Sequence, residues 1–232
     1  MNSLILFFTF VTVATAAYTV FAPALQTYIV NTHNNIRSNV AKGLVAWKNG
    51  IDGTKRPAGL KYPKATNMYQ LVWDPTLAAS AGRRAASKNS SETATYPYLN
   101  AVLPAGVGEN HYGLAVGPMT PANMAPKTKF DNAMSQWSFY KKWGLPNIKY
   151  TKTSDPIAFS AQDNSYQFFA ANTYAIGCAF ATYQPQDSFV VVCHYKARGL
   201  TVGVPIYKNG TTCSACPAGS KCVVAKGLCA KN

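Results

Sequence analysis

The chain has 232 residues, enough for one well-packed domain and a small appendage. Lysine and arginine outnumber aspartate and glutamate by 22 to 8, which gives a formal net charge of +14 at pH 7. Because the basic residues are scattered as singles and pairs, the charge predicts a cationic surface with weak contacts to anionic glycans or lipid headgroups, and it argues against a nucleic-acid-binding protein.

The first 17 residues predict a secretory signal peptide. An apolar run from Leu4 to Val13 is followed by Ala14-Thr15-Ala16, which matches the small-residue pattern of a cleavage site. The run is too short to span a membrane, and no later run reaches about 20 apolar residues. We therefore expect a secreted protein without a transmembrane segment, whose mature chain begins near Ala17 or Tyr18.

Two amphipathic helices are predicted in the first third of the chain. The first begins at Pro23 and carries His33 on its apolar stripe, where a lone histidine is more often a hydrogen-bonded residue at the core edge than a ligand. A loop rich in glycine and lysine follows. The second helix begins sharply, because Asp74 can cap the free amides and Pro75 suits the first turn.

The middle of the chain predicts a loop, a short strand and a third helix. The segment from Ser90 onward reads as a loop until VGENHYG, residues 107–113, begins a strand. After a loop rich in proline and methionine, a third amphipathic helix carries apolar residues at helical spacing and ends near Gly144-Leu145-Pro146. These apolar residues are Phe130, Met134 and Trp137.

The sequence pattern changes from helical to strand-like in the last third of the chain. The stretches SYQFFAANTYAIGCAFATY and SFVVVCHYKARG are rich in β-branched and aromatic residues, and together they predict a β-hairpin. Cys178 and Cys193 then lie on neighbouring strands, close enough for a disulfide. Early helices and late strands predict an α+β layered domain.

All six cysteines lie between Cys178 and Cys229, downstream of the predicted signal peptide. An even set in an oxidising compartment predicts three disulfides. Cys213 and Cys216 also form a C-x-x-C pair, for which a zinc site or a redox pair is the less favoured alternative. Two sequons, at Asn89 and Asn209, are candidate glycosylation sites.

Several motifs together resemble the CAP superfamily, and most of all its nematode venom allergen-like, or activation-associated secreted, members. The motifs are His33-Asn34 with Arg37, NMYQLVWDPTLAASA at residues 67–81, Gly108-Glu109-Asn110, Ile176-Gly177-Cys178, VVCHYKARG at residues 191–199, and the cysteine-rich tail. The resemblance implies a three-layer α-β-α sandwich over residues 18–203 and a hinge-like extension over residues 204–232. It also implies the tail pairing Cys213–Cys222 and Cys216–Cys229.

The family's central cavity carries two histidines and two glutamates that can hold a divalent ion, and this chain departs from that pattern. Glu109 and Gln167 match, but Asn164 replaces one histidine, Tyr140 stands where a glutamate is expected, and the other histidine aligns near Glu92. His111 shares a strand face with Glu109. We expect a remnant cavity formed by Glu92, Glu109, His111, Asn164 and Gln167. We expect no cofactor and no zinc there, with weak calcium or magnesium binding as the alternative.

Lipid sites are also implied by the resemblance. A sterol loop corresponds to residues 155–166, with Ile157, Phe159 and Tyr166. A fatty-acid groove between the first and third helices would use Tyr28, Phe130, Met134 and Trp137, for which ordinary core packing is the alternative.

We therefore expect a secreted, non-enzymatic nematode effector that engages a host extracellular protein or glycan and carries sterol or fatty acid. The alternative is a divalent-cation-dependent hydrolase that uses the cavity. It is disfavoured because the sequence has no G-x-S-x-G turn and every cysteine has a plausible disulfide partner.

Overall fold

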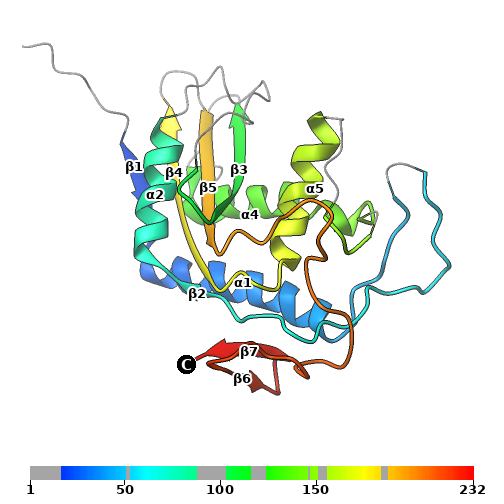
Figure 1. Cartoon of the computed structure of the whole chain (residues 1–232). Coiled ribbons are helices and arrows are strands. Elements are labelled where there is room, and N and C mark those ends of the chain that lie inside the picture. The colour runs from blue at the N-terminus through cyan, green and yellow to red at the C-terminus, as the bar shows by residue number, and fades with distance from the viewer. Residues whose placement is uncertain are drawn as a thin grey trace, which may run out of the picture.

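The computed structural model describes residues 17–50, 53–87, 103–115, 124–145, 147–150, 156–183 and 188–232. A five-stranded sheet forms the middle of the molecule (Figure 1). Its strands are β1 (Tyr18–Val20), β2 (Val72–Trp73), β3 (Val107–Ala115), β4 (Ala175–Tyr183) and β5 (Ser188–Lys196). The order is β1-β4-β5-β3, all antiparallel, and β2 pairs with β4 in parallel.

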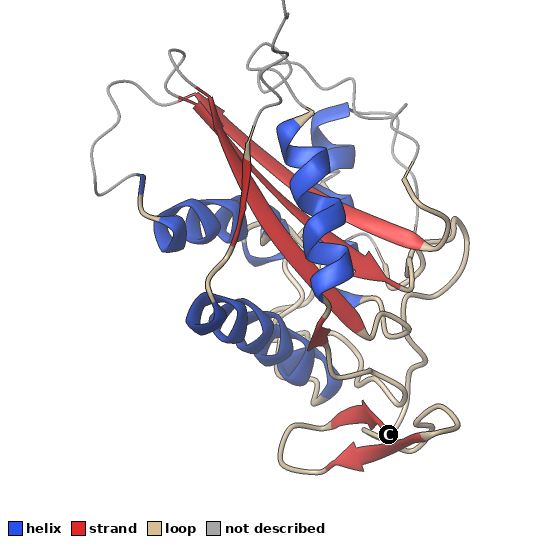
Figure 2. Cartoon of the chain, turned by 90° about the vertical axis from the view of Figure 1, so that its left-hand side faces the viewer, coloured by secondary structure: helices blue, strands red, loops and turns tan. Residues whose placement is uncertain are grey.

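Helices cover both faces of this sheet, as the predicted α-β-α sandwich requires (Figure 2). They are α1 (Pro23–Ala41), α2 (Pro75–Ala86), α4 (Pro126–Trp137), the 3-10 turn η3 (Phe139–Lys141) and α5 (Pro156–Phe169). Along β5, Val190 and Val192 pack with the alanines of α2, while Val191 packs in the core shared with α1, α4 and α5. The period of two along a strand thus separates two cores. None of the described helices is both long and apolar enough to span a membrane.

Small residues allow α2 to lie close to the sheet. The Asp74 side chain caps the helix and accepts hydrogen bonds from the Thr76 and Leu77 amides at 2.8 and 3.1 Å, as predicted. A Cβ at Gly177 of β4 would lie 2.1 Å from the Ala78 nitrogen. Only glycine at this position permits the contact between α2 and β4.

Two predictions of local structure are wrong. Residues 155–166 were expected to form a loop, and the segment from Ser165 was expected to be a strand; instead α5 runs from Pro156 to Phe169 and β4 begins at Ala175. Every residue from Asn164 to Phe169 is buried. A helix buried on all sides lacks a polar face, so its aromatic run resembles a strand in sequence.

Three disulfides use all six cysteines, and they join Cys178 to Cys193, Cys213 to Cys222 and Cys216 to Cys229. Cys178 and Cys193 are directly opposite on β4 and β5. The tail pairing is the one that the family resemblance implies. It leaves no thiolate for zinc or redox exchange at the C-x-x-C pair.

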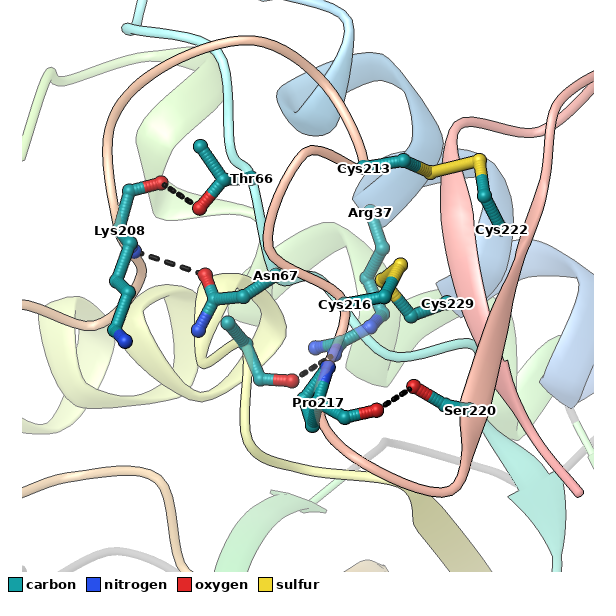
Figure 3. Close-up of a disulfide and its surroundings, with 11 residues drawn as sticks. Arg37, Thr66, Asn67, Lys208, Cys213, Cys216, Pro217, Ser220, Cys222 and Cys229 are labelled. Carbon is teal, nitrogen blue, oxygen red and sulfur yellow. Dashed lines mark hydrogen bonds between the residues drawn. A yellow bond between two sulfur atoms is a disulfide. The ribbon is translucent and has the colours of Figure 1, made fainter.

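The cysteine-rich extension packs tightly on the sandwich (Figures 1 and 3). Its hairpin consists of β6 (Ser220–Val223) and β7 (Leu228–Lys231). The Cys229 amide donates to the Met68 carbonyl at 2.8 Å, and the Gln70 amide donates to the Cys229 carbonyl at 2.9 Å. Leu228 and Cys229 are fully buried. The extension is therefore a fixed part of the fold.

Candidate functional site

Glu109 of β3 is the centre of a polar cluster on the face of the sheet that α2 covers. Its Oε2 atom accepts hydrogen bonds from Arg84 Nε and His194 Nε2, both at 3.1 Å, and its Oε1 atom lies 3.4 Å from His111 Nδ1. His194 Nδ1 lies 3.1 Å from Ser80 Oγ. We call these five residues the Glu109 cluster. The Glu109 side chain is only 8% exposed, so its charge requires these partners.

Strand register and helix period bring the cluster together. Glu109 is directly opposite His194 in the β3–β5 ladder, so their side chains share a face. His111 is two residues further along β3 and therefore lies on that same face. Ser80 and Arg84 are one turn apart on α2.

The residues predicted to form one cavity lie on two different faces of the sheet. Asn110 Nδ2 donates to the Asn164 carbonyl at 3.2 Å, which places Asn164 on the opposite face of β3 from Glu109. Gln167 lies against Gly108, and its Nε2 donates to Thr173 Oγ1 at 3.0 Å. The sheet itself therefore separates Glu109 and His111 from Asn164 and Gln167. Glu92 lies outside the described residues.

The Glu109 cluster is poorly arranged for a metal ion. Glu109 offers a carboxylate and His111 and His194 offer imidazoles, which are ligand types that zinc accepts. However, within the described chain only Cys213, Cys216 and Cys229 bring three such ligand atoms close together, and all three are disulfide-bonded. Arg84 already supplies a cation to Glu109 Oε2. The residues present do not fit the family's divalent ion.

Ser80, His194 and Glu109 form a hydrogen-bonded chain that resembles a hydrolase triad in composition. Ser80 lies inside α2, between Pro75 and Ala86, where backbone amides bond to carbonyls of the same helix. The α2 amides around it are therefore engaged and cannot form an oxyanion hole, on which acyl transfer depends. The chain of hydrogen bonds supports an architectural role that ties α2 to β3 and β5.

His194 and Arg84 were missed by the sequence prediction. The signature VVCHY contains His194, but its link to Glu109 depends on the β3–β5 register, which the sequence does not reveal. Arg84 is visible only as one of two adjacent arginines, Arg83 and Arg84. Both become identifiable once Glu109 and His194 are known to be opposite.

His33 is hydrogen-bonded, as predicted, but it lies in the core and not at its edge. Its Nδ1 is 2.9 Å from the Ile29 carbonyl and its Nε2 is 3.0 Å from the Tyr195 hydroxyl. The carbonyl can only accept, so Nδ1 carries the proton and Nε2 accepts from Tyr195. Burial lowers the pKa of His33 to about 4, so the ring is neutral at pH 7.

A groove of about 990 Å³ lies between α1 and α4. Tyr28, Asn35, Ile36 and Asn39 of α1 line one wall, and Asp131, Met134 and Ser135 of α4 line the other. It continues past Phe139 and Tyr140 to Lys141, Lys142 and Trp143. More than half of its lining side chains are polar, so the groove suits an amphipathic ligand better than a purely apolar one.

The four predicted groove residues divide into two pairs. Tyr28 and Met134 line the groove, and the Tyr28 hydroxyl donates to Asp131 Oδ1 at 2.9 Å. Phe130 and Trp137 are 1% and 0% exposed and belong to the core beneath it. Trp137 Nε1 also donates to the His111 carbonyl at 2.8 Å. For Phe130 and Trp137, core packing is the correct interpretation.

The predicted sterol segment is helical from Pro156 onward, where a loop was expected. Ile157 and Phe159 lie in α5, and their side chains are outside the described set. Tyr166 is fully buried, and its hydroxyl donates to the Asn147 carbonyl at 3.3 Å. Of the two sequons, Asn209 is exposed and Asn89 lies outside the described residues.

Comparison with known proteins places this arrangement in a family. Venom allergen 5 of Lycosa singoriensis is 29% identical over 205 residues, which cover 87% of this chain and 48% of the relative. Ancylostoma secreted protein of Ancylostoma caninum is 30% identical over 203 residues, which cover 86% of this chain and 42% of the relative. The chain therefore spans less than half the length of these two relatives.

Solved structures and a family model agree with these relatives. The structure of BmVAL-1 matches with a TM-score of 0.67 and 25% identity, covering 91% of this chain and 96% of that one. The model of the cysteine-rich secretory protein family, named CAP, matches residues 30–195. Because this match includes the GEN strand, the β4–β5 hairpin and the VVCHY signature, the chain belongs to the CAP family of cysteine-rich secretory proteins.

Proposed function

We propose that the chain is a secreted, non-enzymatic binding protein that carries a fatty acid in the groove between α1 and α4. The groove is the single observation that supports this proposal most strongly. Its volume of about 990 Å³ is at the upper end of small-molecule sites, which run from about 300 to 1,000 Å³. Relatives such as Ancylostoma secreted protein support secretion, and a role as a nematode effector that engages host molecules is part of the proposal.

The groove offers complementary groups for the two parts of a fatty acid. Ile36, Met134 and Phe139 provide apolar surface for the hydrocarbon chain, whose burial is favourable whatever the salt concentration. Lys141 and Lys142 are exposed at one part of the lining and can pair with the carboxylate. Sterol is a weaker candidate, because the residues predicted to bind it lie in the helix α5 and not in a loop.

The alternative, a cation-dependent hydrolase, has no comparable support. The Glu109 cluster holds its own cation in Arg84, and its serine lacks free amide donors. A binding protein requires neither a nucleophile nor a metal.

Mass spectrometry of organic extracts tests the proposal on protein purified from its native secretions. We expect fatty acids in a near one-to-one ratio with the protein, retained after washing at about 0.5 M salt, where charge attraction is screened beyond several ångströms. Extracts that contain no lipid, or lipid that the salt wash removes, would contradict fatty-acid carriage. If the extracts contain one sterol per protein and no fatty acid, the ligand has no carboxylate to pair with Lys141 and Lys142, and a different binding site would be indicated.

A further inference from the structure

The basic residues concentrate in two segments that meet at one end of the molecule. Residues 42–73 and 204–232 contain 10 of the 22 lysines and arginines but only one of the eight acidic residues, Asp52. Among the described residues of these segments there is no acidic side chain to neutralise them. The overall charge of +14 is therefore uneven, although the sequence shows no block of basic residues.

Three segments bring their lysines together where the extension meets the end of α1. Lys42 Nζ donates to the Ala225 carbonyl at 2.7 Å, and an added Cβ at Gly227 would lie 3.3 Å from Lys42 Cε. A Cβ at Gly43 would lie 2.9 Å from Lys64 Cγ. The Ser38 hydroxyl donates to the Lys226 carbonyl at 2.6 Å. Lys42, Lys64 and Lys226 therefore lie near one another at this end of α1, in a region that we call the basic pole.

Two large apolar side chains next to the basic pole in the sequence are exposed to solvent. Val224, at the β6–β7 turn, is 83% exposed, the highest value among the large hydrophobic residues described. Leu44, two residues after Lys42, is 56% exposed. A purely electrostatic partner such as a sulfated glycan gains nothing from either side chain. Apolar side chains among lysines instead match the headgroup region of a membrane, where both kinds of contact contribute.

The basic pole is rigid. The disulfides Cys213–Cys222 and Cys216–Cys229 fix the extension beside Arg37 and the loop at Thr66 and Asn67 (Figure 3). The Lys208 amide donates to Asn67 Oδ1 at 2.9 Å, and the Gly210 amide donates to the Lys64 carbonyl at 3.1 Å. A preformed surface avoids the entropy cost of ordering a loop on binding.

We propose that the basic pole docks on the surface of membranes that contain anionic lipids, with Val224 and Leu44 inserted among the headgroups. The groove begins close to this region, because Asn39 lines it and Lys42, the C-cap residue of the same helix, follows three residues later. Docking would then place the groove beside a source of lipid. The benefit of placing the groove beside lipid rests on the proposed function, whereas the docking of the basic pole on a membrane does not.

Vesicle co-sedimentation tests the proposal with the full chain. Vesicles of phosphatidylserine and phosphatidylcholine in equal parts should bind the wild type, and pure phosphatidylcholine vesicles should not. Combining Lys64→Gln and Lys226→Gln of the basic pole with Lys221→Gln of β6 in the same extension, all at exposed positions, should weaken binding about 100-fold, since each lysine near the surface contributes about fivefold. Combining Arg83→Gln, Lys149→Gln and Lys196→Gln removes equal charge elsewhere and should change binding less than about fivefold.

Val224→Ser separates a membrane from a sulfated glycan. We expect it to weaken vesicle binding up to about tenfold, from the lost burial of one valine, and to leave elution from a heparin column unchanged. The proposal is overturned if both triple variants weaken vesicle binding equally, or if Val224→Ser binds vesicles like the wild type. If the purified protein carries fatty acid but binds neither type of vesicle, the docking proposal is rejected and the proposed function stands.

Discussion

Replacing Arg37 with methionine should destabilise the protein more than any exposed substitution. Arg37 is fully buried, and its five N–H groups donate to the backbone carbonyls of Tyr69, Phe168, Ala170, Ala171 and Thr173 at 2.9–3.3 Å. These bonds attach α1 to the end of α5 and to the segment before β4. Burial lowers the pKa of Arg37, but to about 9, so it remains charged at neutral pH.

The magnitude follows from the carbonyls that lose a donor. Ala170 and Ala171 keep backbone partners, since their carbonyls also accept from the Thr173 and Tyr69 amides. Each of the other three loses a charged hydrogen bond, at about 1–2 kcal/mol per buried group. We therefore expect Arg37→Met to lower the free energy of unfolding by about 3–6 kcal/mol.

Urea unfolding under non-reducing conditions, followed by tryptophan fluorescence, measures this loss. The matched control is Arg83→Met, which removes an exposed arginine from α2 and should change stability by less than about 0.5 kcal/mol. An Arg37→Met variant within about 1 kcal/mol of the wild type would refute the reasoning, because five buried bonds would then contribute almost nothing.

Three further predictions concern other parts of the structure. Burial lowers the pKa of His33 from 6.5 to about 4, so its contribution to stability is complete above pH 6.5 and is lost toward pH 4, at a cost of about 3 kcal/mol. Urea unfolding at pH 7 and pH 4 should show a smaller loss for His33→Gln than for the wild type, and equal losses would contradict this assignment. Calorimetric titration with zinc should show no binding tighter than about micromolar, because Arg84 holds Glu109; tight binding that disappears in Glu109→Gln would restore a metal site. Gly177→Ala should destabilise by about 1–3 kcal/mol, because its Cβ meets the α2 backbone; an unfolding midpoint like that of the wild type would mean that α2 shifts freely.

The sequence predicts those features whose signal is local or is carried by the family motifs. Asp74 and Pro75 mark the start of α2, and the β-branched and aromatic residues around Cys178 and Cys193 predict paired strands. The α5 helix escapes prediction because residues 164–169 are buried on all sides, so neither periodicity nor a polar face identifies it.

The polar cluster depends on long-range register and could not be predicted in full. His111 is correctly placed beside Glu109 by the period of two, whereas His194 lies 85 residues from Glu109 in the sequence. Gln167 was expected near Glu109 but lies beyond Gly108, on the other face of β3. Glu109 and Gln167 both match the family pattern, yet their side chains lie on opposite faces of the sheet.

A matched pair of tryptophan substitutions on α1 tests the central claim, fatty-acid binding in the groove. Asn35 and Asn31 are both exposed and one turn apart, but only Asn35 lines the groove. We predict that Asn35→Trp fills the groove and reduces binding of a fluorescent fatty acid at least tenfold, while Asn31→Trp binds like the wild type. Equal binding by Asn35→Trp and Asn31→Trp would contradict the account, because the lipid would then lie elsewhere.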